Sequence, residues 1–406
     1  MTKKEFGILS LPVIVAALGY FVDIYDLLLF SIIRVPSLTS LGLSEAMADS
    51  EGLRIINIQM IGLLIGGFLW GILGDKLGRM KVLFASIILY SLGNIANGFV
   101  QTVDQYAAVR FFSGIGLAGE LGASITLVSE ILSKEKRGLG TSVVAGIGLS
   151  GAVFAFAMKQ NFDWRICYFI GGGMGFLLLF LRAGVFESSM FDAMKTKQIV
   201  KGNIAMLVNN KKRFVKYVKA ILIGIPTWYV IGILITFSNK FGKEMGIVGK
   251  IDAGKSIMYA YVAIAISDFL GGFISHYFKS RKKAIAFFYI IAIVAIILYF
   301  NLQGKSVENL YWVCALLGFG TGFWALFVTM AAEQFGTNIR ATATTTVPNI
   351  VRGSLVLTSL LFTSLQTNFD YVKSGWITGI VIMSLASLAL IFTQETFGKD
   401  LDYIEE

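Results

Sequence analysis

The chain has 406 residues, and its composition is that of a membrane protein rather than a water-soluble one. Hydrophobic residues make up 56% of the chain and charged residues 15%, whereas soluble domains average roughly 45–50% and roughly 25%. The net charge of +10 lies mainly in short connections between apolar runs, which excludes a nucleic-acid-binding surface as its cause. Two cysteines and one histidine are too few for a disulfide framework or a Cys/His metal site.

Apolar runs long enough to cross a bilayer, about 20 residues each, recur twelve times along the chain. We therefore predict an all-α integral membrane fold of twelve transmembrane helices. In chain order the predicted helices span residues 8–33, 55–74, 80–100, 105–132, 140–159, 164–184, 217–238, 255–277, 283–301, 308–333, 341–365 and 372–394.

The basic residues predict the orientation of these helices. Cytoplasmic loops carry an excess of Lys and Arg, and here the excess flanks the start of the chain and the even-numbered connections. We predict a multi-pass protein of a cell (inner) membrane, surrounded by lipid, with both termini in the cytoplasm. The signal is carried by Lys3, Lys4, Lys76, Arg79, Lys81, Lys134, Lys136, Arg137, Lys211, Lys212, Arg213, Lys216, Lys219, Lys279, Arg281, Lys282 and Lys283.

The chain divides near its middle into two similar halves. The fourth and tenth predicted helices both close on the pattern Glu-x6-Arg, as Glu130 with Arg137 and as Glu333 with Arg340, 203 residues further on. A charged stretch with little apolar periodicity separates them. We predict an N-terminal six-helix bundle over 1–185, a cytoplasmic linker over 186–216 and a C-terminal six-helix bundle over 217–406, in a pseudo-twofold arrangement.

The connection after the second predicted helix reads Gly71-Ile-Leu-Gly-Asp75-Lys-Leu-Gly-Arg79-Met-Lys81. Its glycines permit a sharp turn and close helix packing, and Asp75 can accept a hydrogen bond from a neighbouring helix end. This run resembles the signature loop of the major facilitator superfamily, which implies a solute site between two halves and transport by alternating access. We predict a cytoplasmic gate, including two charge latches, formed by Gly71, Asp75, Gly78, Arg79, Glu130, Arg137, Glu333 and Arg340.

Four further runs resemble the metabolite:proton symporters and related porters of this superfamily. They cover residues 21–26, with the sequence Phe-Val-Asp-Ile-Tyr-Asp, residues 110–120 with an extension over 129–138, the two ends of the sixth predicted helix at Trp164-Arg165 and at Arg182 with Glu187-Ser188, and the tail that begins at Gln394. Residues 22–30 and the short linker also resemble the phagosomal nutrient transporters of intracellular bacteria. Two features depart from the family pattern, because Gln394 stands where a proline is usual and His276 replaces the aspartate of the second-half signature loop.

Ionisable residues inside the predicted spans point to the mechanism, because a charge in the bilayer is costly and usually functional. Asp23 and Asp26 lie three residues apart and share one helix face. The resemblance to sugar porters implies an ion pair between Asp26 and Arg110, the loss of which would favour proton uptake. We predict that protons couple at Asp23, Asp26, Glu120 and Asp268; a purely structural ion pair for Asp26 and a backbone hydrogen bond for Glu120 are the alternatives.

Arg352 stands near the centre of the eleventh predicted helix, where its permanent charge needs an anion. We expect that anion to be Asp268, Glu333 or a substrate carboxylate, which the planar guanidinium can bind through two hydrogen bonds. Aromatic residues after Pro226 and after the glycine-rich run 318–322 either line the cavity or face lipid and core. The predicted substrate-binding residues are Asp26, Arg110, Glu120, Trp228, Tyr229, Trp324, Asn349 and Arg352.

These features predict a secondary active transporter that takes up a small carboxylate-bearing metabolite, an organic acid or an amino acid, together with protons. We expect no enzymatic activity, no cofactor and no metal, with the proton as coupling ion, sodium as the alternative, and a monomer as the working unit. The alternatives left open are a proton antiporter that exports a drug or metabolite, a transporter of a polycarboxylate siderophore, and a nutrient sensor that does not transport.

One nucleotide-binding pattern is set aside. Residues 249–256, Gly-Lys-Ile-Asp-Ala-Gly-Lys-Ser, satisfy G-x-x-x-x-G-K-[ST]. A phosphate-binding loop needs a strand before it and a free helix N-terminus after it, whereas this run has no strand pattern before it, leads into a membrane span and is predicted to lie outside. We therefore expect no ATP binding; nucleotide binding by the purified protein would instead indicate an ATP-driven membrane enzyme.

Overall fold

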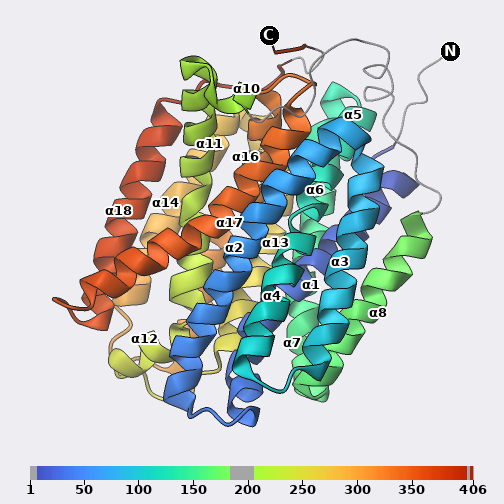
Figure 1. Ribbon diagram of the computed structural model, residues 1–406. Coiled ribbons are helices and arrows are strands. Elements are labelled where there is room, and N and C mark those ends of the chain that lie inside the picture. Colours follow the sequence, from blue (N-terminus) through green and yellow to red (C-terminus); the bar gives the residue numbers. More distant parts are fainter. Residues whose placement is uncertain (1–6, 183–204, 400–402, 406) are drawn as a thin grey trace.

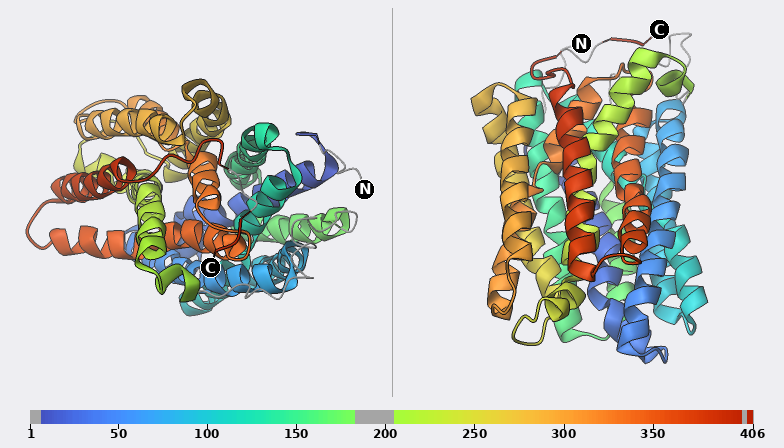
Figure 2. Two further views of the ribbon diagram at one scale, coloured as in Figure 1. Left: turned by 90° about the horizontal axis from the view of Figure 1, so that it is seen from above. Right: turned by 90° about the vertical axis from the view of Figure 1, so that its left-hand side faces the viewer.

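The computed structural model describes residues 7–182, 205–399 and 403–405. Within these residues all regular secondary structure is helical, apart from one isolated β-bridge between Val248 and Ser306. The helices stand side by side as one bundle, and both described ends of the chain lie at the same end of it (Figure 1). We call this the terminus-bearing end and the other the opposite end; Figure 2 shows the bundle from above and from the side.

The described part of the first half forms six spans from eight helices, because two spans are interrupted. The pairs α4–α5 and α6–α7 each form one span. The helices are α1 (Leu11–Ser40), α2 (Glu45–Leu77), α3 (Arg79–Phe99), α4 (Val103–Leu117), α5 (Glu120–Ile131), α6 (Lys134–Leu149), α7 (Gly151–Asn161) and α8 (Trp164–Arg182).

The second half repeats this pattern. A π-helix, η1, continues α11 within one span, and α15 and α16 together form another. The helices are α10 (Ala205–Val208), α11 (Lys211–Tyr229), η1 (Val230–Ile235), α12 (Ser238–Glu244), α13 (Ala253–Phe278), α14 (Arg281–Phe300), α15 (Val307–Gly320), α16 (Trp324–Glu333), α17 (Arg340–Leu365) and α18 (Tyr371–Ile391).

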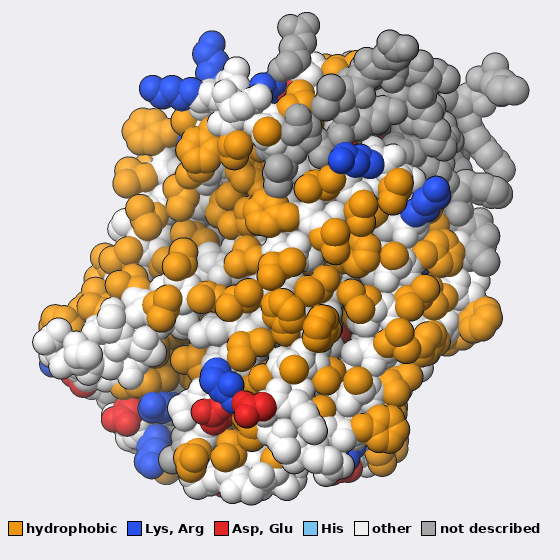
Figure 3. All heavy atoms as spheres, in the orientation of Figure 1, with side chains coloured by type: hydrophobic (Ala, Val, Ile, Leu, Met, Phe, Trp, Pro, Cys, Tyr) orange, Lys and Arg blue, Asp and Glu red, His pale blue; other side chains and the backbone are white. Residues whose placement is uncertain are grey.

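The predicted twelve-helix membrane fold is confirmed. Ten spans among the described residues are long and apolar enough to cross a membrane on their own. The other two are the interrupted span α4–α5 and the threonine-rich α17, which is 26 residues long. Hydrophobic side chains cover the visible face between the two ends (Figure 3). Much of the predicted linker 186–216 lies outside the described residues, and its last part is helical because α11 begins at Lys211.

Polar caps fix where the helices begin. At the opposite end the side chains of Ser44, Thr102, Asp252, Ser306 and Asp370 each accept a hydrogen bond from a backbone N–H in the first turn of the following helix. Such caps satisfy N–H groups that have no partner within the helix. The chain therefore turns at short polar motifs that interrupt otherwise apolar runs.

Breaks in the spans occur at equivalent places in the two halves. Gly119 separates α4 from α5, and Gly322, 203 residues later, lies between α15 and α16. Pro226 lies inside α11, just before η1. Discontinuous helices in transporters expose backbone groups near the substrate site, and π-helical segments often mark functional sites. These breaks therefore indicate where to look for the site.

Glycines set the distance between helices. A Cβ atom added to Gly62 of α2 would overlap the carbonyl oxygen of Phe111 on α4, and one added to Gly353 of α17 would overlap Leu64 of α2. In contrast, Gly173 of α8 is exposed, and a Cβ there would meet nothing within 4 Å. Small residues at these contacts allow the close backbone approach on which helix association in membranes depends.

Replacing Gly62 with valine should therefore destabilise the first half. Overpacking a tight contact costs about 1–3 kcal/mol, and here the obstacle is backbone, which cannot rotate away. The thermal midpoint of the purified protein in detergent measures the effect. Gly173→Val is the matched control and should melt close to the parent; equal losses from both variants would contradict this account of the α2–α4 contact.

Candidate transport site

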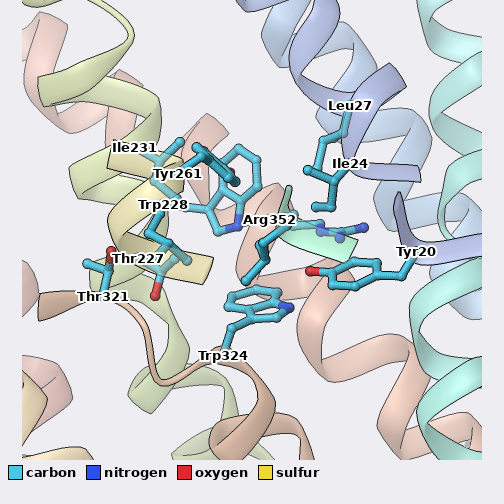
Figure 4. Close-up of a pocket in the computed structure, with 12 residues that line it drawn as sticks. Tyr20, Ile24, Leu27, Thr227, Trp228, Ile231, Tyr261, Thr321, Trp324 and Arg352 are labelled. Atoms are coloured by element: carbon cyan, nitrogen blue, oxygen red, sulfur yellow. The ribbon is translucent and has the colours of Figure 1, made fainter. Parts of the chain in front are cut away.

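A small cavity lies between the two halves near the middle of the bundle. It encloses about 20 Å³, roughly the room that one water molecule needs. Figure 4 shows Arg352 at its centre, with Tyr20 on one side, Trp228 on the other and Trp324 close by. The cavity is lined by Tyr20, Ile24, Leu27 and Leu149 of the first half and by Thr227, Trp228, Ile231, Tyr261, Ile264, Thr321, Trp324 and Arg352 of the second.

Arg352, the charged residue of the cavity lining, forms an ion pair that joins the two halves. A guanidinium nitrogen of Arg352 on α17 lies 3.3 Å from a carboxylate oxygen of Asp23 on α1, and both side chains are fully buried. The Nε atom of Arg352 and the second oxygen of Asp23 have no hydrogen-bond partner among the described residues. The guanidinium also lies 5.9 Å from the ring centre of Trp324. Arg352 is thus only partly satisfied by Asp23.

The structural partners expected for Arg352 were wrong. Asp268 instead accepts a hydrogen bond from the backbone N–H of Ala325, at 2.9 Å, and Glu333 pairs with Arg281 at 3.0 Å. The reason is the break before α16, which presents free N–H groups to Asp268. The second oxygen of Asp268 is buried without a partner among the described residues.

Asp26 and Arg110 form a separate pair inside the first half. Their side chains meet at 2.7 Å, and Arg110 also donates to the backbone carbonyl of Asp26 and to Gln59. Both are fully buried, and neither belongs to the residues that line the cavity. Although Asp23 and Asp26 share a helix, they therefore engage arginines from different halves.

Glu120 has a partner that sequence reasoning missed. It forms an ion pair with Arg182, the last residue of α8, and accepts a hydrogen bond from Ser124 at 3.0 Å. Gly19 of α1 makes room for the pair, because a Cβ there would overlap both side chains. From the sequence, an arginine at the end of an apolar span would ordinarily be assigned to the membrane surface. In the structure the Arg182 side chain is only 1% exposed and points to Glu120 instead.

Of the other predicted substrate-binding residues, Trp228 and Trp324 line the cavity, whereas two do not. The hydroxyl of Tyr229 donates to the carbonyl of Gly375 at 2.7 Å, within the second half. The amide of Asn349 donates at 2.8 Å to the carbonyl of Ala118, beside the break in the first half. Sequence reasoning missed the polar lining residues Tyr20, Tyr261, Thr227 and Thr321. Tyr20 and Tyr261 lie three and seven residues before Asp23 and Asp268 on the same helices, and Thr227 adjoins Trp228, whereas Thr321 lies at the break between α15 and α16.

The terminus-bearing end is closed by contacts between the halves. Asp75 accepts hydrogen bonds from the N–H and hydroxyl of Thr342, at 2.7 and 2.6 Å, in the first turn of α17. A negative charge suits a helix N-terminus. Gly71 lies against Thr342, and Gly78 has a φ of 104°, which favours glycine. Glu130 and Arg340 face each other across the halves at 3.9 Å.

The second predicted latch is arranged differently from the sequence pattern, and Glu130 of the first latch has a partner in the other half. Glu130 meets Arg340 from the other half, whereas Glu333 meets Arg281 from its own half. The side chains of Arg79 and Arg137, also assigned to the gate, lie outside the described residues. The role of these residues in gating stays a prediction.

The opposite end is closed as well. Arg34 of α1 donates to Asp49 of α2 at 2.8 Å and to the carbonyl of Thr236 in the second half at 3.1 Å. Asn239 donates to the same Asp49. We call these four residues the clasp. A second bridge, 2.7 Å long, joins Lys159 of α7 to Asp252. Contacts between the halves are thus present at both ends of the bundle, with the small central cavity between them.

Breaking the Asp26–Arg110 pair should destabilise the protein strongly. Asp26→Asn leaves the Arg110 charge buried and uncompensated, which typically costs about 3–5 kcal/mol. The double variant Asp26→Asn/Arg110→Gln should recover part of the loss, as measured by thermal unfolding in detergent. Glu51→Gln, which breaks a partly exposed pair with Arg54, should cost less than about 1 kcal/mol. A normal midpoint for Asp26→Asn would contradict the assignment.

Glu395 ties the tail to the start of α14, and this contact should depend on pH. Partial burial opposes its charge, but hydrogen bonds from the Ser280 hydroxyl and from three backbone N–H groups prevail and lower the pKa of Glu395 below its ordinary value of 4.5. A carboxyl with a lowered pKa stabilises the fold above its unfolded pKa and loses that effect as pH falls through its folded pKa.

Glu395→Gln should therefore lower the thermal midpoint most near neutral pH, and its difference from the parent should shrink as pH falls below 4.5. Ser280→Ala removes one donor to Glu395 and should make the pH-dependent difference smaller. The measurement is the thermal unfolding midpoint of the parent and of each variant in detergent, taken from neutral pH to below pH 4.5. A difference that stays constant with pH would show that the charge of Glu395 does not stabilise the tail.

Comparisons with known proteins agree with this architecture. The family model of the Major Facilitator Superfamily matches residues 16–348. The niacin transporter NiaP of Acinetobacter baylyi is 26% identical, over 96% of this chain and 95% of its own length. The putative niacin/nicotinamide transporter NiaP of Bacillus subtilis is also 26% identical, over 96% of both.

A solved structure shares the fold. The proton:xylose symporter XylE matches with a TM-score of 0.77, covering 96% of this chain and 97% of that chain at 19% identity, and this likeness speaks for the fold alone. The family model, in contrast, spans well over half of the sequence. Together with the twelve spans and the paired halves, it shows that the chain belongs to the Major Facilitator Superfamily, as a multi-pass membrane transporter and not an enzyme.

Proposed function

We propose that the protein takes up a small carboxylate-bearing metabolite together with protons, by alternating access of its two halves. The observation that carries the proposal is Arg352, a permanent cation fully buried in an aromatic cavity between the halves and only partly satisfied by Asp23. A guanidinium binds a carboxylate through two parallel hydrogen bonds. The relatives named as niacin transporters support this class, since niacin is a pyridine ring with one carboxylate.

In this proposal, protons are coupled to transport because the Arg352–Asp23 pair has to stay electrically neutral when a substrate carboxylate binds. Arg352 and Asp23 together are neutral. If a substrate carboxylate takes the place of Asp23 on Arg352, a buried carboxylate is left unpaired, and an isolated charge at that depth is very costly. Uptake of one proton by Asp23 removes this cost, so one carboxylate would enter with one proton. Asp26, Glu120 and Asp268 remain proposed coupling residues, of which Asp268 has no basic partner among the described residues.

The proposed cycle uses the two closed ends as gates. The terminus-bearing end, where the basic residues of the even-numbered connections gather, would face the cytoplasm of a cell with an inner membrane. Contacts of Asp75 and of Glu130 with α17 would close that side, and the clasp with the Lys159–Asp252 bridge would close the other. In this scheme the 20 Å³ cavity widens when either set of contacts opens.

The test uses purified protein, as a monomer, in proteoliposomes with an imposed proton gradient and radiolabelled niacin as the probe. The parent should accumulate niacin without sodium and lose accumulation when a protonophore collapses the gradient. Arg352→Ala should weaken niacin binding at least about thirtyfold, because losing a buried charged partner costs about 2 kcal/mol or more. Asp23→Asn should keep binding but lose the acceleration by the gradient.

Arg54→Ala is the matched control, since Arg54 lies at the opposite end and is 43% exposed; it should bind and transport as the parent does. Normal niacin binding by Arg352→Ala would overturn the anion site. Gradient-driven accumulation by Asp23→Asn would overturn its role in coupling. Niacin efflux driven by inward proton flow would identify an antiporter, and binding without any transport would identify a sensor.

A further inference from the structure

A second cavity lies between the halves at the opposite end, and we call it the outer chamber. It encloses about 190 Å³, far more than the central cavity. Residues of α2 form one wall, and residues of η1, α12, α17 and α18 form the rest. The lining residues are Asp49, Ser50, Leu53, Ile233, Phe237, Lys240, Phe362, Thr363, Gln366 and Tyr371.

The walls combine aromatic rings with one cation that lacks an ion pair. Phe237, Phe362 and Tyr371 supply the rings. The ammonium of Lys240 lies 4.6 Å from the ring centre of Tyr371, and no carboxylate within 4.0 Å pairs with it in the described part of the chain. The side chain of Gln366 is half-buried and makes no hydrogen bond there either, which leaves an amide donor facing the same space.

The acidic residue of the lining does not cancel this charge. Asp49 is already paired with Arg34 at 2.8 Å and accepts a hydrogen bond from Asn239. Arg34 in turn lies 4.4 Å from the ring centre of Phe237. With Asp49 neutralised by the clasp, Lys240 gives the chamber a net positive charge, which favours an anion over a cation or a neutral sugar.

The size limits the class of anion. A protein cavity of about 150 Å³ holds one benzene molecule, so 190 Å³ suits a single six-membered ring with a small substituent. Aromatic side chains in the wall can pack against an aromatic ligand in offset or edge-to-face contact, which is the favoured geometry for ring pairs. We propose that the outer chamber is a second binding site, for a single-ring aromatic monocarboxylate held by Lys240, Gln366 and the aromatic walls.

A ligand in the chamber would also act on the clasp. Its carboxylate, held by Lys240, would lie near Asp49, which is paired with Arg34. Two carboxylates side by side repel each other, so Asp49 would bind Arg34 and Asn239 less tightly. The chamber would thus bind the substrate before it reaches the central cavity. The bound substrate would also weaken the contacts of the clasp, which join the two halves at this end. For the substrate class this inference rests on the proposed function, but its geometry does not involve Arg352.

The experiment labels the full-length protein in lipid nanodiscs with 4-azidobenzoate under ultraviolet light and locates the labelled peptides by mass spectrometry. The parent should carry label in two places, at residues 237–240 or 362–371 of the chamber and near Trp228 or Trp324 of the central cavity, and excess niacin should remove both. Lys240→Gln should reduce the chamber label about tenfold, which corresponds to about 1.4 kcal/mol, and should spare the central label.

Lys243→Gln, an exposed lysine of the same short helix, is the matched control and should label as the parent does. Lys240→Arg keeps the charge and should retain the chamber label; it also serves if Lys240→Gln does not fold. Arg352→Ala should lose the central label and keep the chamber label. Label confined to the central cavity, no label at all, or a chamber label unchanged in Lys240→Gln would overturn the inference. A parent protein that carries label in the chamber but none in the central cavity would instead count against the proposed function.

Discussion

A charge buried in a bilayer has to meet its counter-charge inside the protein, and this constraint determines how the two halves join at the cavity. Arg352 and Asp23 come from different halves, and each gives the other its charged partner. Asp26 and Arg110 satisfy each other within one half. Asp26 and Arg110 therefore need no partner from the other half, whereas Asp23 and Arg352 balance each other only while the two halves are in contact.

The interruptions in the helices complement this arrangement. Gly119 and Gly322 break spans at equivalent places in the two halves, and each break bares backbone groups that a neighbour satisfies. Asn349 reaches across to the first break, and Asp268 reaches the second from within its own half. The backbone groups that the two breaks leave without helical partners are thus satisfied by side chains inside the bundle, which is what the lipid surroundings require.

The membrane fold was predictable because its signals are local: apolar runs of the right length and basic connections can be read from short windows. The observed ends of the spans differ from the predicted ends by several residues. A helix can begin at a single capping side chain, such as Ser44 or Asp370, and a window of hydropathy does not detect one residue. The site was less predictable. Arg352 could be identified as a buried cation in need of an anion, but its partner depends on which helices face each other across the halves. Arg182 was missed as a partner for the same reason.

The two closed ends differ in how they would respond to dissolved ions. At the terminus-bearing end the facing charges of Glu130 and Arg340 are fully buried, so mobile ions hardly reach them. At the other end the Lys159–Asp252 bridge is 18% and 40% exposed, so dissolved ions reach it and reduce what the pair contributes. Salt on that side should therefore weaken this bridge more than it weakens the buried contact at the terminus-bearing end, so the contacts at the two ends differ in their sensitivity to ionic strength.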